Sequence, residues 1–80
     1  MLMSLHERLE GIARDVFGDD TIVLTDETTS KDIPEWDSLG HVNFVYSVEQ
    51  EFGVEFSADQ FAELSNISAL KQELTRRGLV

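Results

Sequence analysis

Apolar residues recur every three or four positions near the start of the chain, at Leu5, Leu9, Ile12 and Val16. This spacing places them on one face of a helix, and we predict a helix over residues 4–17. Ser4 and Glu7 have the spacing of a capping box, in which two side chains reciprocally satisfy free backbone amides. Gly18 is the expected end of this helix.

Residues 18–37 carry no helical periodicity. The stretch "TIVLT" has the composition of a strand, but a single isolated strand has nothing to pair with. We therefore expect a long ordered loop that Ile22, Leu24 and Ile33 attach to the core. Pro34 supports this interpretation, because proline disfavours helical geometry at the residue before it.

A second helix is predicted from Ser38 to Phe52, with Gly53 as its end. Its apolar residues cover more than half of the helical circumference at about 100° per residue. They are Leu39, Val42, Phe44, Val45, Tyr46, Val48 and Phe52. We therefore expect this helix to be central and packed on more than one side.

A short third helix is predicted over residues 58–64. Ser57 and Gln60 form another capping box, and Phe56 is placed to pack on Phe61 as a hydrophobic staple. The prediction therefore rests on local signals at the start of the helix.

Asn66 is expected to cap a last helix over residues 67–77. Arg76 and Arg77 stand at its C-terminus, where positive charge suits the helix dipole. Its expected inward residues are Ile67, Leu70 and Leu74. The whole pattern predicts one all-α domain, residues 1–80, with three main helices, one short helix and a long ordered loop between the first two helices.

The charge balance narrows the classes of partner. Sixteen acidic side chains against six basic ones give a net charge of −10. Nucleic acid and anionic membranes favour the opposite sign, so we expect neither as a partner. An acidic surface favours proteins with basic patches, although the same acidity is typical of a small protein that merely stays soluble.

Composition also limits the chemistry and the compartment. The chain has no cysteine, which excludes a disulfide scaffold and a thiolate metal site and fits a reducing compartment. No apolar stretch approaches the roughly 20 residues of a membrane span. The start, "MLMSLHERLE", lacks the features of a secretory signal. We expect a cytoplasmic, free-standing monomer.

Ser38 is the candidate site residue, because it stands where the polar loop meets the second helix. It is a good N-cap, but a helix N-terminus also suits an attached phosphate. His41 follows one turn later, so a Ser–His nucleophile must be considered. Asp37 diverges from that pair on a helix, and no glycine-rich elbow surrounds the serine, so a hydrolase is disfavoured.

Two other features have simple interpretations. The acidic window from Asp26 to Asp37 lacks the central glycine and final glutamate of a calcium-binding loop, and we expect no metal site. Trp36 is a large ring within the loop. We expect it to pack beneath the loop, with the alternative that it flanks whatever Ser38 carries.

The segment "DSLGHVNFVYSVEQEFGVEF", at its distance from both ends of the chain, resembles acyl carrier proteins and the related peptidyl carrier proteins. The resemblance covers nearly all 80 residues. It implies that Ser38, flanked by Asp37 and Leu39, is the attachment point of 4′-phosphopantetheine, transferred from coenzyme A by a separate phosphopantetheinyl transferase. The carrier would then hold acyl or aminoacyl groups as thioesters without catalysing a reaction itself.

The sequence departs from fatty-acid synthase carriers at several positions. Gly40 and Asn43 stand where those carriers have acidic residues, and His41 and Tyr46 replace smaller or more flexible ones. We therefore favour a specialised pathway, such as polyketide, nonribosomal peptide or modified saccharide synthesis, with a D-alanyl carrier as a further relative. The alternative function is an unmodified acidic adaptor that binds a basic partner.

Partner contacts and cargo complete the expectations. The loading and processing enzymes are expected to bind through residues around the second helix, namely Glu35, His41, Tyr46, Glu49 and Glu51. Bulky aromatic residues should fill the small core and leave little room for a long buried chain. They are Phe44, Phe52, Phe56 and Phe61. We therefore expect a short or polar acyl group.

Overall fold

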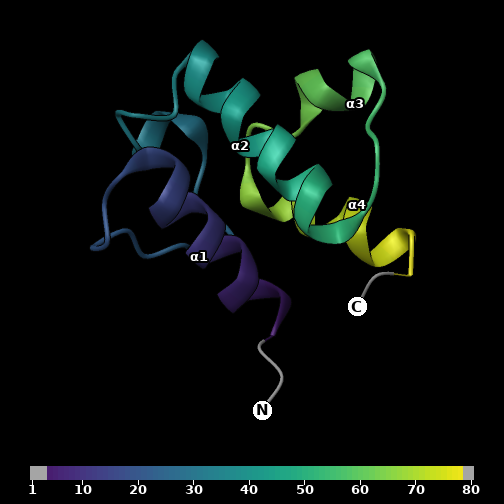
Figure 1. The fold of residues 1–80 in the computed structure, drawn as a ribbon, viewed down its shortest axis with the longest axis horizontal. Helices are drawn as coiled ribbons and strands as arrows, with labels where there is room; N and C mark the ends of the chain where they lie inside the picture. Colours follow the sequence, from purple (N-terminus) through teal and green to yellow (C-terminus); the bar gives the residue numbers. More distant parts are fainter. Residues whose placement is uncertain (1–3, 79–80) are drawn as a thin grey trace.

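A computed structural model describes residues 4–78 of the chain. Its helices are α1 (Leu5–Phe17), α2 (Ser38–Phe52), α3 (Ala58–Glu63) and α4 (Ile67–Arg76), and a 3-10 turn, η1, spans Ser30–Asp32 (Figure 1). No strand is present within the described residues. The all-α prediction is therefore confirmed, with helix ends within one residue of those expected.

Local capping signals set the helix boundaries. The Ser4–Glu7 and Ser57–Gln60 capping boxes are both present, and the side chain of Asn66 accepts the amide of Ala69 at 2.8 Å. Both α1 and α2 end at a glycine, Gly18 and Gly53 respectively, in the left-handed conformation with φ of 66°. That geometry suits glycine because it has no Cβ.

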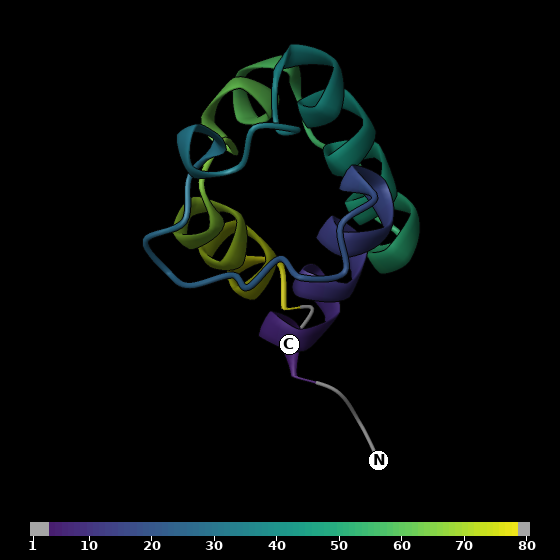
Figure 2. The same ribbon diagram turned by 90° about the vertical axis from the view of Figure 1, so that its left-hand side faces the viewer.

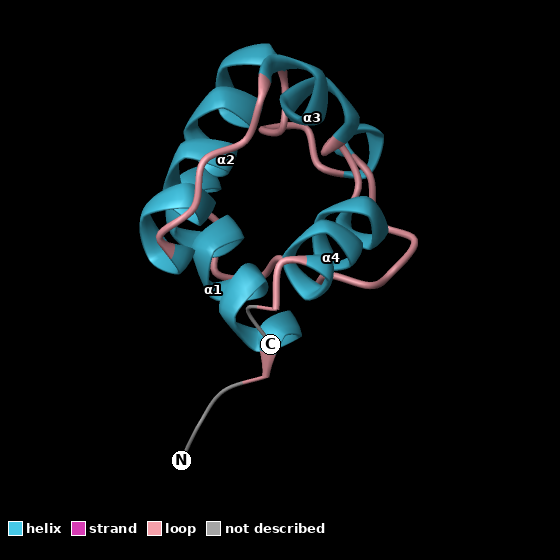
Figure 3. Ribbon diagram, turned by 90° about the vertical axis from the view of Figure 1, so that its right-hand side faces the viewer, coloured by secondary structure: helices cyan, strands magenta, loops and turns pink. Residues whose placement is uncertain are grey.

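Viewed end-on, the four helices form a ring, with α1 beside α2 and α3 beside α4 (Figure 2 and Figure 3). Side chains from all the main helices and from the α1–α2 loop fill its interior. The predicted anchors Ile22, Leu24 and Ile33 are buried, and Trp36 is only 3% exposed. The loop is therefore part of the core, as predicted.

The buried face of α1 is centred one position away from the predicted one. Leu9, Ala13 and Phe17 are buried, whereas Leu5, Ile12 and Val16 are half-buried at the edges. The spacing identified an apolar side correctly. The position of its centre depends on where α2 and the loop lie, which the α1 sequence does not encode.

Helix α2 packs against α1 and also contacts α3 through His41, as predicted, but one part of its apolar circumference is exposed. Phe44, Val45 and Val48 are buried, but Leu39 and Tyr46 are 70% and 60% exposed, and Val42 is also exposed. These three residues lie at helical spacing on one side of α2. Within the described chain this side is largely uncovered, although Val42 and Tyr46 also border α3, and we call it the exposed α2 stripe.

Pairing between the loop and α4 was not predicted. Thr29 and Asn66 form an isolated antiparallel β-bridge. Ser30 N donates to the carbonyl oxygen of Ser65 at 2.9 Å, and Ile67 N donates to that of Thr28 at 3.0 Å. The loop therefore crosses from α1 to the start of α4 (Figure 2) and brings η1 close to the α3–α4 junction.

No helix within residues 4–78 combines the length and apolar character needed to cross a membrane.

Candidate functional site

Ser38 is the first residue of α2, and its neighbour Asp37 is the N-cap. The Asp37 carboxylate accepts the amide of Gly40 at 2.8 Å, and its backbone carbonyl accepts that of His41, also at 2.8 Å. The interpretation of Ser38 as the cap is therefore wrong. Its hydroxyl is exposed and makes no hydrogen bond to any described residue.

A close approach between the loop and α2 fixes the position of this serine. A Cβ at Gly40 would overlap the carbonyl oxygen of Glu35 and lie 3.2 Å from Cε1 of Phe17. Only glycine lets the loop lie so near the first turn of the helix. Gly40, noted above as a departure from fatty-acid synthase carriers, therefore has a packing reason in this chain.

His41 joins the loop, α2 and α3. The indole Nε1–H of Trp36 donates to its Nδ1 at 2.9 Å, and its Nε2 lies 2.8 Å from the backbone carbonyl oxygen of Phe61. An indole nitrogen only donates and a carbonyl only accepts, so the neutral ring with the proton on Nε2 satisfies both contacts. The rings of His41 and Phe61 also pack, with centroids 4.6 Å apart.

These contacts argue against the Ser–His nucleophile considered from the sequence. Both ring nitrogens of His41 are engaged by Trp36 and Phe61, and neither hydrogen-bonds to Ser38. A general base needs a hydrogen bond to the hydroxyl that it activates. His41, which is half-buried, instead packs the elements around Ser38 together.

A hollow of about 330 Å³ lies directly beside Ser38. We call it the Ser38 hollow. It is lined by Ser30, Trp36, Asp37, Ser38, His41 and Ser65. Trp36 is buried beneath the loop, as expected, and it also borders the candidate site. That it flanks a group on Ser38 stays a prediction.

An apolar groove of about 380 Å³ runs between α2 and α3, and we call it the α2–α3 groove. Phe56 and Phe61 both line it, half-buried, together with Val42, Val45 and Tyr46 of α2. The hydrogen bond from His41 to Phe61 joins a residue of the Ser38 hollow to a residue of this groove. The expected staple between Phe56 and Phe61 stays a prediction.

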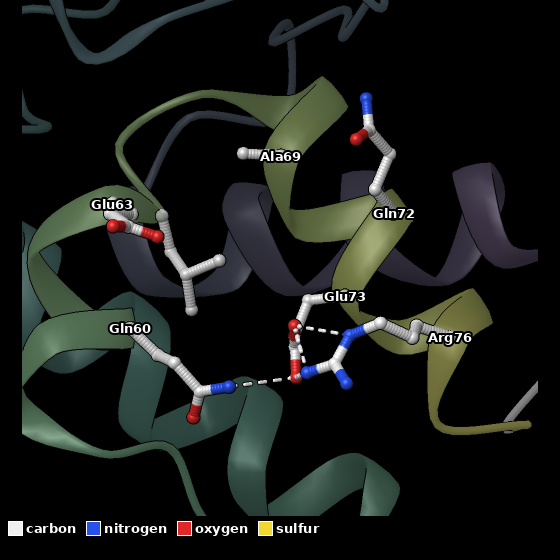
Figure 4. Close-up of a pocket in the computed structure, with 7 residues that line it drawn as sticks. Gln60, Glu63, Ala69, Gln72, Glu73 and Arg76 are labelled. Carbon is white, nitrogen blue, oxygen red and sulfur yellow. Dashed lines mark hydrogen bonds and ion pairs between the residues drawn. The ribbon is translucent and has the colours of Figure 1, made fainter.

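A third hollow, of about 230 Å³, lies between α3 and α4 (Figure 4). Glu73 there accepts a hydrogen bond from the Gln60 amide at 2.9 Å and pairs with Arg76 and Arg77 at 2.7 and 2.6 Å. Hydrogen bonds from Arg76, and then from Arg77, hold the pKa of Glu73 below its ordinary value of 4.5. These groups satisfy one another, so the network holds α3 on α4.

The predicted partner-binding acids occupy three different settings. The exposed Glu35 stands next to the site. Glu49 is half-buried and accepts the amide of Phe56 at 2.8 Å, which ties α2 to the segment before α3. Glu51 pairs with Arg8 of α1 at 3.0 Å. Of these three acids, only Glu35 lies beside Ser38.

The apolar side chains near Ser38 include two that the sequence did not identify as surface residues. Leu39 and Val42 join the predicted Tyr46 in the exposed α2 stripe. Their exposure could not be predicted from periodicity, because α2 is apolar around most of its circumference. Among the described residues, no group of three or more His, Cys, Asp or Glu side chains could hold a metal ion.

The start of α2 fits an attached phosphate. The amides of Ser38 and Leu39 have no hydrogen-bond acceptor within residues 4–78. Free amides and the positive end of a 15-residue helix favour an anion at this position. The exposed hydroxyl of Ser38 is positioned to carry one.

An exposed serine at the start of a long helix in an all-α bundle, with the neighbouring histidine engaged elsewhere, is the arrangement expected for a carrier domain that is modified at this serine. Residues 7–74 match the family described as "Phosphopantetheine attachment site". The chain belongs to this family. It is an acyl carrier protein with covalently attached 4′-phosphopantetheine and no catalytic activity of its own.

A solved structure agrees with this assignment. The solution NMR structure of a holo acyl carrier protein from Geobacter metallireducens superposes with a TM-score of 0.79 and 38% sequence identity. The match covers 94% of this chain and 91% of that one. A comparison with curated proteins gave no significant match.

Proposed function

We propose that Ser38 is the residue that carries the 4′-phosphopantetheine. The observation that supports this proposal is that one residue at the start of α2 caps the helix while the next one, Ser38, stays exposed. Asp37 caps the helix, which leaves the Ser38 hydroxyl exposed and without a hydrogen-bond partner among the described residues. The serine is therefore accessible to a second protein without disruption of the helix.

Attachment requires coenzyme A and a separate phosphopantetheinyl transferase. Ser38 Oγ forms a P–O bond to the phosphorus that bears pantetheine, the pyrophosphate bond of coenzyme A breaks, and adenosine 3′,5′-bisphosphate leaves. The transferase supplies the base that takes the serine proton, because no described side chain hydrogen-bonds to this hydroxyl. When bound, the group supplies a thiol that holds an acyl or aminoacyl chain as a thioester.

The residues around Ser38 have supporting roles in this proposal. Asp37 keeps the first turn of α2 in place, and the free amides of Ser38 and Leu39 stabilise the phosphodiester charge.

Glu35 and the exposed α2 stripe, including Tyr46, face the transferase and the enzymes that load and process the cargo. His41, Glu49 and Glu51 contribute by fixing the shape of this surface.

The cargo is proposed to be short or polar, in a specialised pathway in the cytoplasm, where coenzyme A is available. Of the four aromatic residues expected to fill the core, only Phe44 is fully buried, whereas Phe52 and Phe56 pack at its edge and Phe61 lines the α2–α3 groove. The buried rings that do pack against one another are those of Phe17, Trp36 and Phe44. Burial of a long chain would have to displace such contacts or use the open α2–α3 groove. Thermal unfolding of acetyl-loaded and long-chain-loaded protein tests this, and clear stabilisation by the long chain alone would contradict it.

The attachment itself is tested with purified apo protein, coenzyme A, magnesium and a transferase of broad specificity. The intact mass of the wild type should rise by one phosphopantetheine group, and Ser38→Ala should show no gain. Ser65→Ala is the matched control, because this serine lines the same hollow, and it should be modified normally. Modification that persists in Ser38→Ala would refute the assignment. A folded wild type left unmodified by several transferases would favour the unmodified adaptor.

A further inference from the structure

Two hydroxyl groups in the Ser38 hollow have no assigned task. Ser30, from η1, and Ser65, from the α3–α4 junction, are half-buried and joined through their backbones by a hydrogen bond of 2.9 Å. Neither side-chain hydroxyl has a hydrogen-bond partner within residues 4–78. Neither hydroxyl is fully enclosed, and both residues line the hollow. They can each donate and accept one or more hydrogen bonds.

The Ser38 hollow lies directly beside the proposed attachment point. Ser38 is one of the residues that line it, so a group attached to Ser38 starts at its edge. The pantetheine arm contains two amides and a hydroxyl, which are complementary to serine hydroxyls in hydrogen bonding. Tethering also gives the arm a high effective concentration at this surface.

A contact between α2 and α3 separates the Ser38 hollow from the α2–α3 groove. Along α2, Ser38 and His41 line the hollow, whereas Val42 and Val45 on the next turn line the α2–α3 groove. Between these two sets, His41 hydrogen-bonds to the carbonyl of Phe61 on α3. This hydrogen bond therefore lies between the residues that line the Ser38 hollow and those that line the groove.

We propose that the Ser38 hollow is a seat for the inner part of the pantetheine arm, with Ser30 and Ser65 hydrogen-bonding to its amides. The seat rests on the proposed attachment at Ser38. It holds the arm against the loop and the start of α4, on the hollow side of the His41–Phe61 contact. The arm returns to this seat when no partner enzyme withdraws it.

The test measures solvent exchange of the amide protons of an isotope-labelled arm by NMR, after intact mass has shown that the arm is attached. Exchange should be slower in the wild type than in the Ser30→Ala/Ser65→Ala double variant by about fivefold, the effect of one ordinary hydrogen bond. Ser47→Ala, which removes a half-buried hydroxyl elsewhere on α2, is the matched control and should exchange like the wild type. Thermal unfolding shows whether each variant keeps its fold.

The outcomes separate the seat from the attachment. Equal exchange in the modified wild type and the modified double variant overturns the seat and leaves the attachment standing. Faster exchange in Ser47→Ala, to the same degree as in the double variant, also overturns the seat. A wild type that gains no mass overturns the attachment and the seat together.

Discussion

At the scale of single residues, the start of α2 divides two tasks between neighbours. Asp37 and Ser38 are both good N-cap residues, so the sequence alone allowed either one to cap the helix. The structure gives the cap to Asp37. The hydroxyl of Ser38 is then free for modification, which a capping serine would not be.

This division predicts unequal effects on stability. Asp37→Ala should lower the free energy of unfolding by about 1 kcal/mol, because the Gly40 amide loses its acceptor. Ser38→Ala should change it by less than about 0.5 kcal/mol, as expected for an exposed side chain without partners. Urea denaturation of both variants measures the difference. Equal losses would show that the Ser38 hydroxyl takes part in the cap.

Gly40 gives a second prediction at this scale. Gly40→Ala should destabilise the fold by about 1–3 kcal/mol, because its Cβ would overlap the Glu35 carbonyl and force the loop away from α2. Gly11→Ala is the control in the middle of α1, where a Cβ meets nothing within 4 Å. It should stabilise the protein by about 0.5–1 kcal/mol through helix propensity. An unchanged stability in Gly40→Ala would contradict the close approach.

At the scale of secondary-structure elements, predictability follows the distance along the chain between the interacting groups. The capping boxes at Ser4 and Ser57 involve residues three apart, so the sequence displays both partners together. The bridge between Thr29 and Asn66 joins distant segments through backbone groups. Backbone groups are the same at every residue, so no pattern of side chains predicts this pairing.

The same reason explains what was missed at the site. The sequence identified Ser38, Asp37 and Trp36, because hydroxyl, carboxylate and indole groups are visible in it. It could not show that His41 binds a backbone carbonyl on α3, 20 residues away. Nor could it place Ser30 and Ser65 beside Ser38, since the loop pairing brings them there.

The Glu73 network that holds α3 on α4 predicts how stability depends on pH. The pKa of Glu73 is depressed in the folded state, so the stability from its network is complete above 4.5 and is lost as the pH falls through the lower folded value. Glu73→Gln should therefore be less stable than the wild type near pH 7, and the gap should close as the pH falls below the lowered pKa of Glu73 in the folded state.

The control for this prediction is Glu63→Gln, which removes the same charge from an exposed residue at the end of α3 that has no ion pair in the described chain. It should differ little from the wild type at either pH. Thermal unfolding across the pH range measures both variants. A Glu73→Gln deficit that persists at low pH would show that lost packing, rather than lost charge, causes it.

At the scale of the whole molecule, attraction of a basic partner depends on the net charge of −10 and on where each acidic side chain lies. Glu51 is paired with Arg8 and Glu49 binds a backbone amide, whereas Glu35 is exposed at the Ser38 end of α2. Steering of a basic partner depends on charge near the docking surface, because salt largely screens interactions between exposed charges that are more than about 8–10 Å apart.

Two charge reversals with the same net change separate local steering from bulk charge. Glu35→Lys should slow modification by the transferase at low salt, and the defect should shrink as salt is added. Glu55→Lys is the control, because it follows the other end of α2, roughly 20 Å along the helix at 1.5 Å per residue. Equal slowing by both variants would mean that net charge alone governs the encounter.

The attachment point is tested most directly by fragmentation mass spectrometry of the modified wild type. Three serines line the Ser38 hollow, namely Ser30, Ser38 and Ser65, and intact mass alone does not distinguish them. Our account predicts that the whole added mass lies on the fragment from Trp36 to Leu39, at Ser38. Added mass on a fragment that contains Ser30 or Ser65, with Ser38 unmodified, would contradict it.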